Sequence, residues 1–115
     1  MTSAFHQWDI VKARINPNDL TEHPAVVLSR EEFCADEKRR TVNVLYGTTR
    51  RPALEPHILD VVLNSADGLE HATLFSCGHF FTIPKEKIST VLGRVAFERR
   101  RQIGRKIVEA FRLPL

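Results

Sequence analysis

The chain has 115 residues, of which 43% are hydrophobic and 27% are charged, and its formal net charge at pH 7 is +3. This length predicts one domain, 1–115, and the composition excludes a disordered chain or a membrane protein, because no apolar run approaches the ~18 residues of a membrane span. The first residues show no signal-peptide core, and two cysteines do not make a disulfide framework, so we expect a cytoplasmic protein with free thiols.

The first part of the chain predicts short β-strands. Apolar residues alternate with Lys and Arg over 8–15, which is typical of a half-buried strand, and 16–19 (NPND) is a turn cluster. The apolar run within 24–29, bounded by proline and serine, predicts a strand that is buried on both faces. The charged segment 30–40 predicts a loop with one helical turn, and 41–49 (TVNVLYGTT) alternates as another strand.

The middle of the chain continues in the same way. We expect a fourth strand over 57–63, then a turn over 64–68, and two short β-rich pieces, 71–77 and 80–83, with a bulge or bend at Gly78. PKEK can start a single helical turn, and STVLGRV returns to extended structure.

The hydrophobic period changes to that of a helix only at about 96–112. Apolar residues then recur at helical spacing and form a stripe in which Arg99 is the only polar member, with further Arg and Lys residues behind it. Gly104 weakens this helix by roughly 1 kcal/mol relative to alanine, so packing must stabilise it, and Pro114 stops it.

Many short strands followed by one helix predict a mostly β fold, a small and strongly bent barrel whose open end or side the helix covers. Charge is unevenly distributed along the chain. Residues 1–84 hold 8 Lys and Arg and 11 Asp and Glu, whereas residues 85–115 hold 9 Lys and Arg and 3 Asp and Glu. A basic end favours a polyanionic or acidic partner, although the same residues also solvate the outside of a helix.

Several segments resemble, in order and spacing, the MazF/PemK-like toxins of type II toxin–antitoxin systems: WDIVKARINP, HPAVVLS, VNVLYGTT, ILDVVLNSADGL and TVLGRVAFERRRQIGRKIVEAF. The resemblance implies an SH3-like small β-barrel of the MazF/PemK/CcdB type with a C-terminal helix. It also implies a homodimer, a metal-independent endoribonuclease that cleaves single-stranded RNA without a cofactor, and a cognate antitoxin that neutralises it.

The family is thought to cleave RNA with an Arg before its Pro-Ala strand and a Thr at the end of its third strand. The resemblance therefore places His23 and Thr48 as the catalytic residues, with histidine in the place of the arginine. Histidine lacks the permanent charge and planar fork of arginine, but imidazole is the best side chain for proton transfer near neutrality. His23 is thus a general acid or base, an ordinary loop residue of a weakened toxin, or a structural residue.

Other side chains are candidates for contacts with the substrate. Arg50 and Arg51 directly follow the threonine pair and can add positive charge near the scissile phosphate, and Thr49 can bond either backbone or phosphate. Related toxins often have Asp-Gln where this chain has Gly78-His79, and His79 can share a groove with His23, although a half-exposed strand histidine is the plainer interpretation. Asn18 lies in a loop that is shorter than the family's groove-shaping loop, so the resemblance does not imply the family's cleavage specificity.

Three functions stay open at this stage: the nuclease toxin, a catalytically weakened RNA- or protein-binding module, and a gyrase-targeting toxin of the same fold. The five histidines and two cysteines show neither CxxC nor HxxxH spacing, so we expect no metal site. Phe80 and Phe81 can stack on bases, but core packing is the favoured interpretation of this pair.

Overall fold

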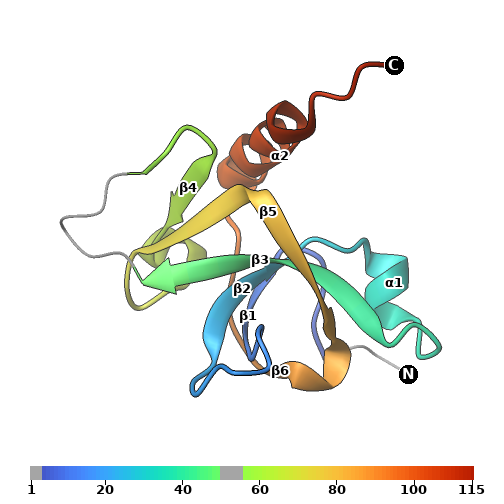
Figure 1. Cartoon of the computed structure of the whole chain (residues 1–115). Helices are drawn as coiled ribbons and strands as arrows, with labels where there is room; N and C mark the ends of the chain where they lie inside the picture. The colour runs from blue at the N-terminus through green and yellow to red at the C-terminus, as the bar shows by residue number, and fades with distance from the viewer. Residues whose placement is uncertain (1–3, 50–55) are drawn as a thin grey trace.

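The computed structural model describes residues 4–49 and 56–115, and it confirms a mostly β fold with a C-terminal helix (Figure 1). The elements follow the predicted order. They are β1 (Asp9–Ala13), β2 (His23–Val27), α1 (Glu31–Ala35), β3 (Thr41–Thr49), β4 (Asp60–Leu63), the short 3₁₀ turns η1 (Ser65–Asp67) and η2 (Lys85–Lys87), β5 (Thr73–Pro84), β6 (Ile88–Arg94) and α2 (Phe97–Phe111).

The six strands form one antiparallel sheet in the order β4-β5-β3-β2-β1-β6, which curls into a barrel-like shape (Figure 1). Within residues 4–49 and 56–115, hydrogen bonds do not close this barrel, because β4 and β6 remain its two edges. The turn η1 after β4 lies against β6 instead: a Cβ on Gly93 would stand 2.2 Å from the carbonyl oxygen of Asp67. Only glycine at this position of β6 lets the two edges approach so closely.

Two hydrophobic clusters occupy the two faces of the central strands. Val11, Ala25 and Val27 belong to one cluster, whereas their neighbours Ile10 and Val26 belong to the other, which packs against α2. Successive side chains of a strand point to opposite faces, so the apolar run in β2 must be buried on both. The prediction for this run is confirmed.

Strand β5 corrects the sequence prediction, because it is one strand of 12 residues and not two pieces. Figure 1 shows a corner in β5 beneath α2, and Gly78 lies near the middle of this strand. A Cβ on Gly78 would lie 3.0 Å from Leu59 Cδ1 and 3.7 Å from Ala110 Cβ, so the bend passes close under the helix. Strand β4 is also shorter than predicted and begins at Asp60.

The helix α2 begins and ends within one residue of the predicted boundaries. Ile103 is fully buried, and Arg99, the single polar member of the stripe, places Nε 3.3 Å from the buried carboxylate of Asp67. That carboxylate also accepts hydrogen bonds from the backbone N–H groups of Ala96 (2.7 Å) and Asn64 (3.0 Å). One buried side chain thus joins η1 to the start of α2. Among the described residues, no helix combines the length and the apolar character that a bilayer crossing requires.

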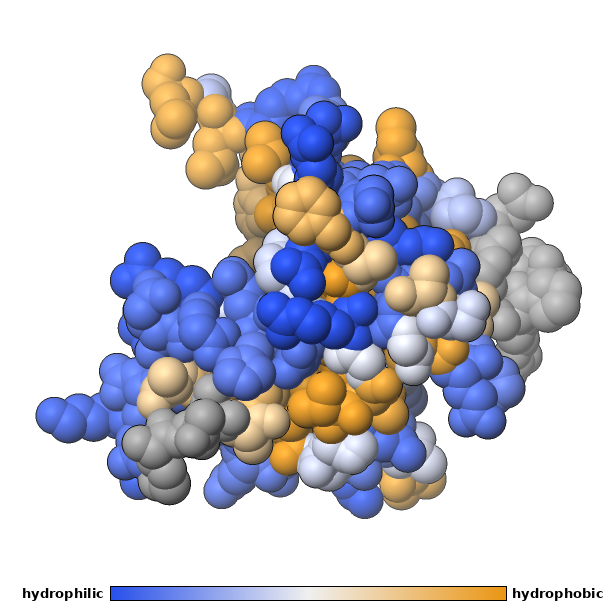
Figure 2. Space-filling model, turned by 180° about the vertical axis from the view of Figure 1, so that it is seen from behind, coloured by the Kyte–Doolittle hydropathy of each residue, from blue (hydrophilic) through white to orange (hydrophobic). Residues whose placement is uncertain are grey.

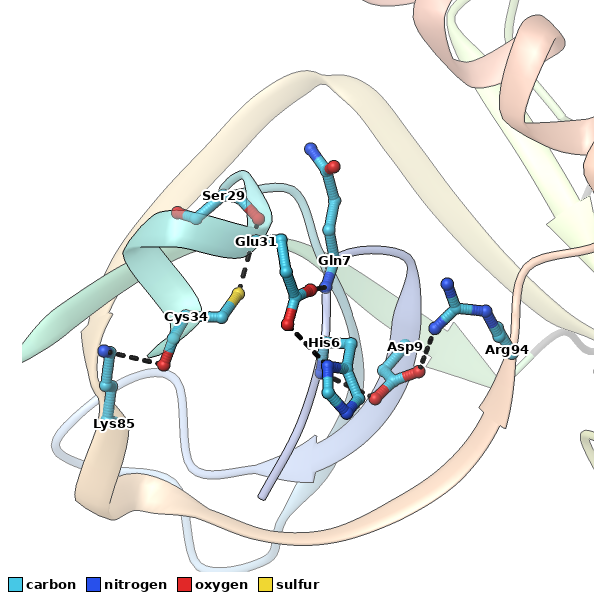
Figure 3. Close-up of polar contacts among 8 residues, drawn as sticks. All are labelled: His6, Gln7, Asp9, Ser29, Glu31, Cys34, Lys85 and Arg94. Atoms are coloured by element: carbon cyan, nitrogen blue, oxygen red, sulfur yellow. Dashed lines mark hydrogen bonds and ion pairs between the residues drawn. The ribbon is translucent and has the colours of Figure 1, made fainter. Parts of the chain in front are cut away.

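The short helix α1 is held at both ends (Figure 3). At its C-terminal end, the Lys85 ammonium donates to the carbonyls of Phe33 (2.7 Å), Cys34 (3.0 Å) and Asp36 (2.9 Å), which satisfies carbonyl groups that a helix end leaves unpaired. The thiol of Cys34 contacts the carbonyl of Ser29, and burial raises its pKa to about 11.

The N-terminal end of α1 is joined to the segment that precedes β1. Glu31 Oε1 lies 2.5 Å from His6 Nδ1, and Glu31 Oε2 accepts a hydrogen bond from the Gln7 backbone (Figure 3). Asp9 continues the network, because it accepts from the His6 backbone at 2.7 Å and from Arg94 at 2.9 Å. The hydrogen bond from His6 is the main reason that the pKa of Glu31 lies below its ordinary value.

Replacing Glu31 by glutamine should make the stability of the protein less dependent on pH in the acid range. A carboxyl group whose pKa is lowered by folding stabilises the folded state fully above its unfolded value, here 4.5, and this contribution is lost as the pH falls through the lowered value. Because the pair is half exposed, we expect a loss of about 0.2–1 kcal/mol at pH 7 and a smaller loss at pH 3. Urea unfolding at both pH values measures this, with Glu32→Gln as the control; an equal loss at both would contradict it.

Candidate functional site

The candidate site lies where β2 begins and β3 ends. The two strands pair Ala25 with Tyr46 and Val26 with Leu45. Continuing this register by two residues sets His23 opposite Thr48. The same register sets Gly47 opposite Pro24, and a Cβ on Gly47 would lie only 2.9 Å from the Pro24 carbonyl oxygen. Residues directly opposite in an antiparallel pair have Cβ atoms about 4.5–5.5 Å apart.

The imidazole of His23 lies between two polar side chains. Its Nδ1 is 3.3 Å from the hydroxyl of Tyr46, and its Nε2 is 3.8 Å from Oδ1 of Asp19. The rings of His23 and Tyr46 are 5.0 Å apart and tilted by 40°. The His23 side chain keeps 29% of its surface exposed, so part of the ring is open to a ligand.

Charge and burial tune this group of three. Backbone hydrogen bonds, first of all that from Asn16, lower the pKa of Asp19, and the nearby His23 adds to this effect. Burial raises the pKa of Tyr46, and the charge of Asp19 raises it further. At neutral pH the site therefore holds an ionised carboxylate and a protonated phenol. A hydroxyl both donates and accepts, so Tyr46 can hold either neutral tautomer of His23.

The loop between β1 and β2 positions Asp19. Its Oδ2 accepts hydrogen bonds from the backbone of Ile15 (3.3 Å) and Asn16 (3.0 Å), and its backbone N–H donates to the Asn16 carbonyl. The segment NPND thus forms the predicted turn, in which an Asp side chain bonds the nearby backbone. Because these bonds use Oδ2, the Oδ1 atom of Asp19 can face His23. Asn18, predicted to contact substrate, is an exposed residue of this turn.

Thr48 is exposed and pairs with Leu74 of β5. Strand alternation places its side chain on the same face as Tyr46 and therefore on the His23 side of the sheet. Thr49 pairs through its backbone with Thr73, but its side chain lies outside the described part of the structure. Arg50 and Arg51 also lie outside the described residues.

His79 lies on the same sheet face as His23 but does not form the two-histidine pair that the sequence suggested. Its ring is 4.7 Å from Phe81, edge to face, and Phe81 is 6.0 Å from Tyr46. Two aromatic rings thus separate the imidazoles. Their joint acid–base action is not supported by this arrangement, and His79 is an exposed strand residue near the bend of β5.

A hollow of about 490 Å³ opens beside these residues, toward the opposite face of β2. Pro24 and Leu92 form part of its apolar wall, and Lys12, Glu22 and His71 add groups that can donate or accept hydrogen bonds. The hollow therefore offers both apolar and polar contacts to a ligand close to the start of β2.

Sequence reasoning missed Asp19 and Tyr46. Asp19 stands four residues before His23 within the predicted turn. Tyr46 shares the predicted face of Val42 and Val44, so the alternation of β3 was a usable signal for it. Their meeting at His23 required the register of β2 against β3.

Known structures share this fold. An endoribonuclease in complex with its cognate antitoxin, from a mycobacterial species, matches with a TM-score of 0.74 and 16% identity, covering 97% of both chains. The Mycobacterium tuberculosis toxin MazF-mt6 matches with a TM-score of 0.74 and 21% identity over 93% of this chain and 99% of its own. A MazE–MazF structure from Deinococcus radiodurans matches with a TM-score of 0.74 and 12% identity over 96% and 97%.

Comparison with the curated proteins finds no match. A family model described as PemK-like, MazF-like toxin of type II toxin–antitoxin system matches residues 6–111, which span both strands of the candidate site and the closing helix. The chain therefore belongs to the PemK-like, MazF-like toxin family of type II toxin–antitoxin systems.

Proposed function

We propose that the protein is a metal-independent endoribonuclease that cleaves single-stranded RNA, with His23 and Thr48 at the scissile linkage. The observation that carries the proposal is the position of His23: one ring nitrogen faces a tyrosine hydroxyl and the other faces a carboxylate. Continuing the β2–β3 register sets the same residue opposite Thr48. Family membership and the endoribonucleases among the similar structures support it.

Cleavage of this kind uses the 2′-hydroxyl of the substrate as nucleophile against the adjacent phosphate. In the proposed reaction His23 Nε2 exchanges a proton with the 2′-hydroxyl or with the departing 5′-oxygen, and Tyr46 holds the ring at Nδ1. The Asp19 carboxylate stabilises the imidazolium that forms when the ring takes a proton. The Thr48 hydroxyl donates to a phosphoryl oxygen as negative charge develops on it.

The remaining predicted contacts belong to the same proposal. Thr49, Arg50 and Arg51 follow Thr48 directly and would bind phosphates, and Asn18 and His79 would contact the substrate elsewhere. Phosphate contacts of this type depend on salt and not on sequence.

We further propose that the protein is a cytoplasmic homodimer which a cognate antitoxin neutralises. Antitoxin complexes among the similar structures support the partner. Exposed apolar side chains near the end of α2 and in the tail that follows, which projects from the body in Figure 2, offer surface for a second copy: Val108, Phe111 and Leu113.

Replacing Thr48 by valine should lower RNA cleavage by about 100-fold, because valine keeps the shape of the side chain but removes the only donor that it offers to a phosphoryl oxygen. The assay uses EDTA-treated protein and single-stranded RNA, with the exposed strand threonine Thr90→Val as the matched control. Unchanged cleavage by Thr48→Val would contradict the assignment. RNA binding without cleavage would favour a binding module, and trapped cleaved DNA a gyrase-targeting toxin.

A further inference from the structure

Four rings follow one another across three neighbouring strands. His23 of β2 lies 5.0 Å from Tyr46 of β3, which lies 6.0 Å from Phe81 of β5, and Phe81 lies 4.7 Å from His79. The row begins at the candidate site and ends at the bend of β5.

All four rings lie on one face of the sheet. Phe81 and His79 are two residues apart in β5, so their side chains point the same way, whereas Phe80 between them points to the other face and packs 5.8 Å from Phe111 of α2. Tyr46 and Phe81 are half-buried against the core, and His79 is exposed. Packing against the core explains why the rings of Tyr46 and Phe81 are half-buried. It does not explain why the exposed imidazole of His79 lies at the end of the row.

We propose that Tyr46, Phe81 and His79 form a stacking track for the bases of single-stranded RNA on one side of the cleaved linkage, an inference that rests on the proposed nuclease function. Single-stranded RNA is bound by stacking its unpaired bases on aromatic rings that neighbouring strands of a sheet present together. Adjacent strands are about 4.8 Å apart, so the row spans about 10 Å from β2 to β5, enough for about two bases.

Continuity with the candidate site favours RNA over a protein partner. A strand whose phosphate lies between His23 and Thr48 can pass directly over Tyr46, with no turn of its backbone away from the sheet. Rings stack on every base, so the track contributes affinity without selecting one sequence. Selection of a particular RNA sequence then depends on polar groups elsewhere, such as those that line the hollow beside Pro24.

The test compares RNA that carries bases with RNA that lacks them. The probes are a fluorescein-labelled, random-sequence 12-nucleotide 2′-O-methyl RNA, which cannot be cleaved, and an abasic strand with the same number of phosphates. We expect wild type to bind the base-bearing strand about tenfold or more tightly than the abasic strand, and His79→Ala/Phe81→Leu to lose most of this preference. Phe80→Leu, altered on the opposite face, should keep it. His79→Ala alone, at an exposed position, should lose part of it even if the double variant is unstable.

The outcomes distinguish a failure of the stacking track from a failure of the nuclease proposal. Equal binding of both strands by wild type, or an unchanged preference in the variants, would overturn the track. Cleavage of unmodified RNA is measured beside it: if wild type cuts and both variants cut with the same kcat/KM, the track is wrong and the nuclease stands. If the base-dependent binding is lost as expected but wild type never cuts, the track stands and the nuclease proposal fails.

Discussion

Replacing His23 by glutamine is expected to lower the rate of RNA cleavage by about 10²–10⁴-fold. Glutamine can still bond the Tyr46 hydroxyl, but it can neither take up nor release a proton near neutral pH. The variant therefore removes proton transfer and keeps most of the size of the side chain. Because 29% of the His23 side chain is exposed and no core residue is lost, the protein should remain folded.

The measurement is kcat and KM on one RNA, together with the melting temperature. The control is His57→Gln, which changes an exposed histidine in the segment before β4, away from His23 and from the hollow. His23→Arg restores the residue type that the family is thought to use, and it should preserve or raise cleavage while its rate changes less between pH 5 and pH 8. A glutamine variant that cleaves like wild type would show that His23 is an ordinary loop residue.

Replacing Asp67 by alanine is expected to lower the free energy of unfolding by about 3–5 kcal/mol. The carboxylate is fully buried, pairs with Arg99 and accepts hydrogen bonds from the backbones of Asn64 and Ala96. Its removal leaves a partly buried guanidinium without its counter-charge and two backbone N–H groups without an acceptor. Among the described residues, the Arg99 guanidinium then keeps its hydrogen bond to the Val62 carbonyl.

Urea unfolding of the two proteins gives this difference, with Glu86→Ala as the control because that side chain is exposed on η2 and should change stability by less than about 0.5 kcal/mol. A loss below about 1 kcal/mol for Asp67→Ala would mean that packing alone holds α2 on the sheet. The expected loss would instead show that this carboxylate fastens the helix to the β4 side of the barrel.

Local patterns were enough to predict most of the elements. Alternating residues predicted β1 and β3, the short apolar run predicted β2, and helical spacing predicted α2 with Arg99 in its stripe. These patterns follow directly from side-chain direction in strands and helices, which does not depend on the rest of the chain. The bend at Gly78 was predicted from another local signal, because a glycine inside a strand often marks a bend or a close approach of the backbone.

Contacts between distant residues could not be predicted in this way. No local pattern indicated that Arg99 would meet Asp67, 32 positions earlier, because the apolar stripe of a helix does not reveal which residues face it. Strand β5 was divided in two because four residues on its side bulge opposite one residue of β3, and such an insertion interrupts the alternation of side chains.

The candidate site falls between these two cases. Resemblance to a family identified His23 and Thr48, yet only the register of β2 against β3 sets them opposite each other, and a slip by one residue would turn their side chains to different faces. Asp19 and Tyr46 depend on the same register and on the turn of the β1–β2 loop. The chemistry assigned to His23 thus rests on tertiary structure more than on its position in the sequence.

The most direct measurement is the chemistry of the cut ends. Single-stranded RNA is incubated with wild-type protein in EDTA, and the product termini are identified by mass spectrometry. Attack by the substrate's own 2′-hydroxyl, with His23 moving protons and no metal ion, leaves a 2′,3′-cyclic phosphate on one product and a 5′-hydroxyl on the other. Intact RNA, or products that carry a 5′-phosphate and a 3′-hydroxyl, would contradict this account.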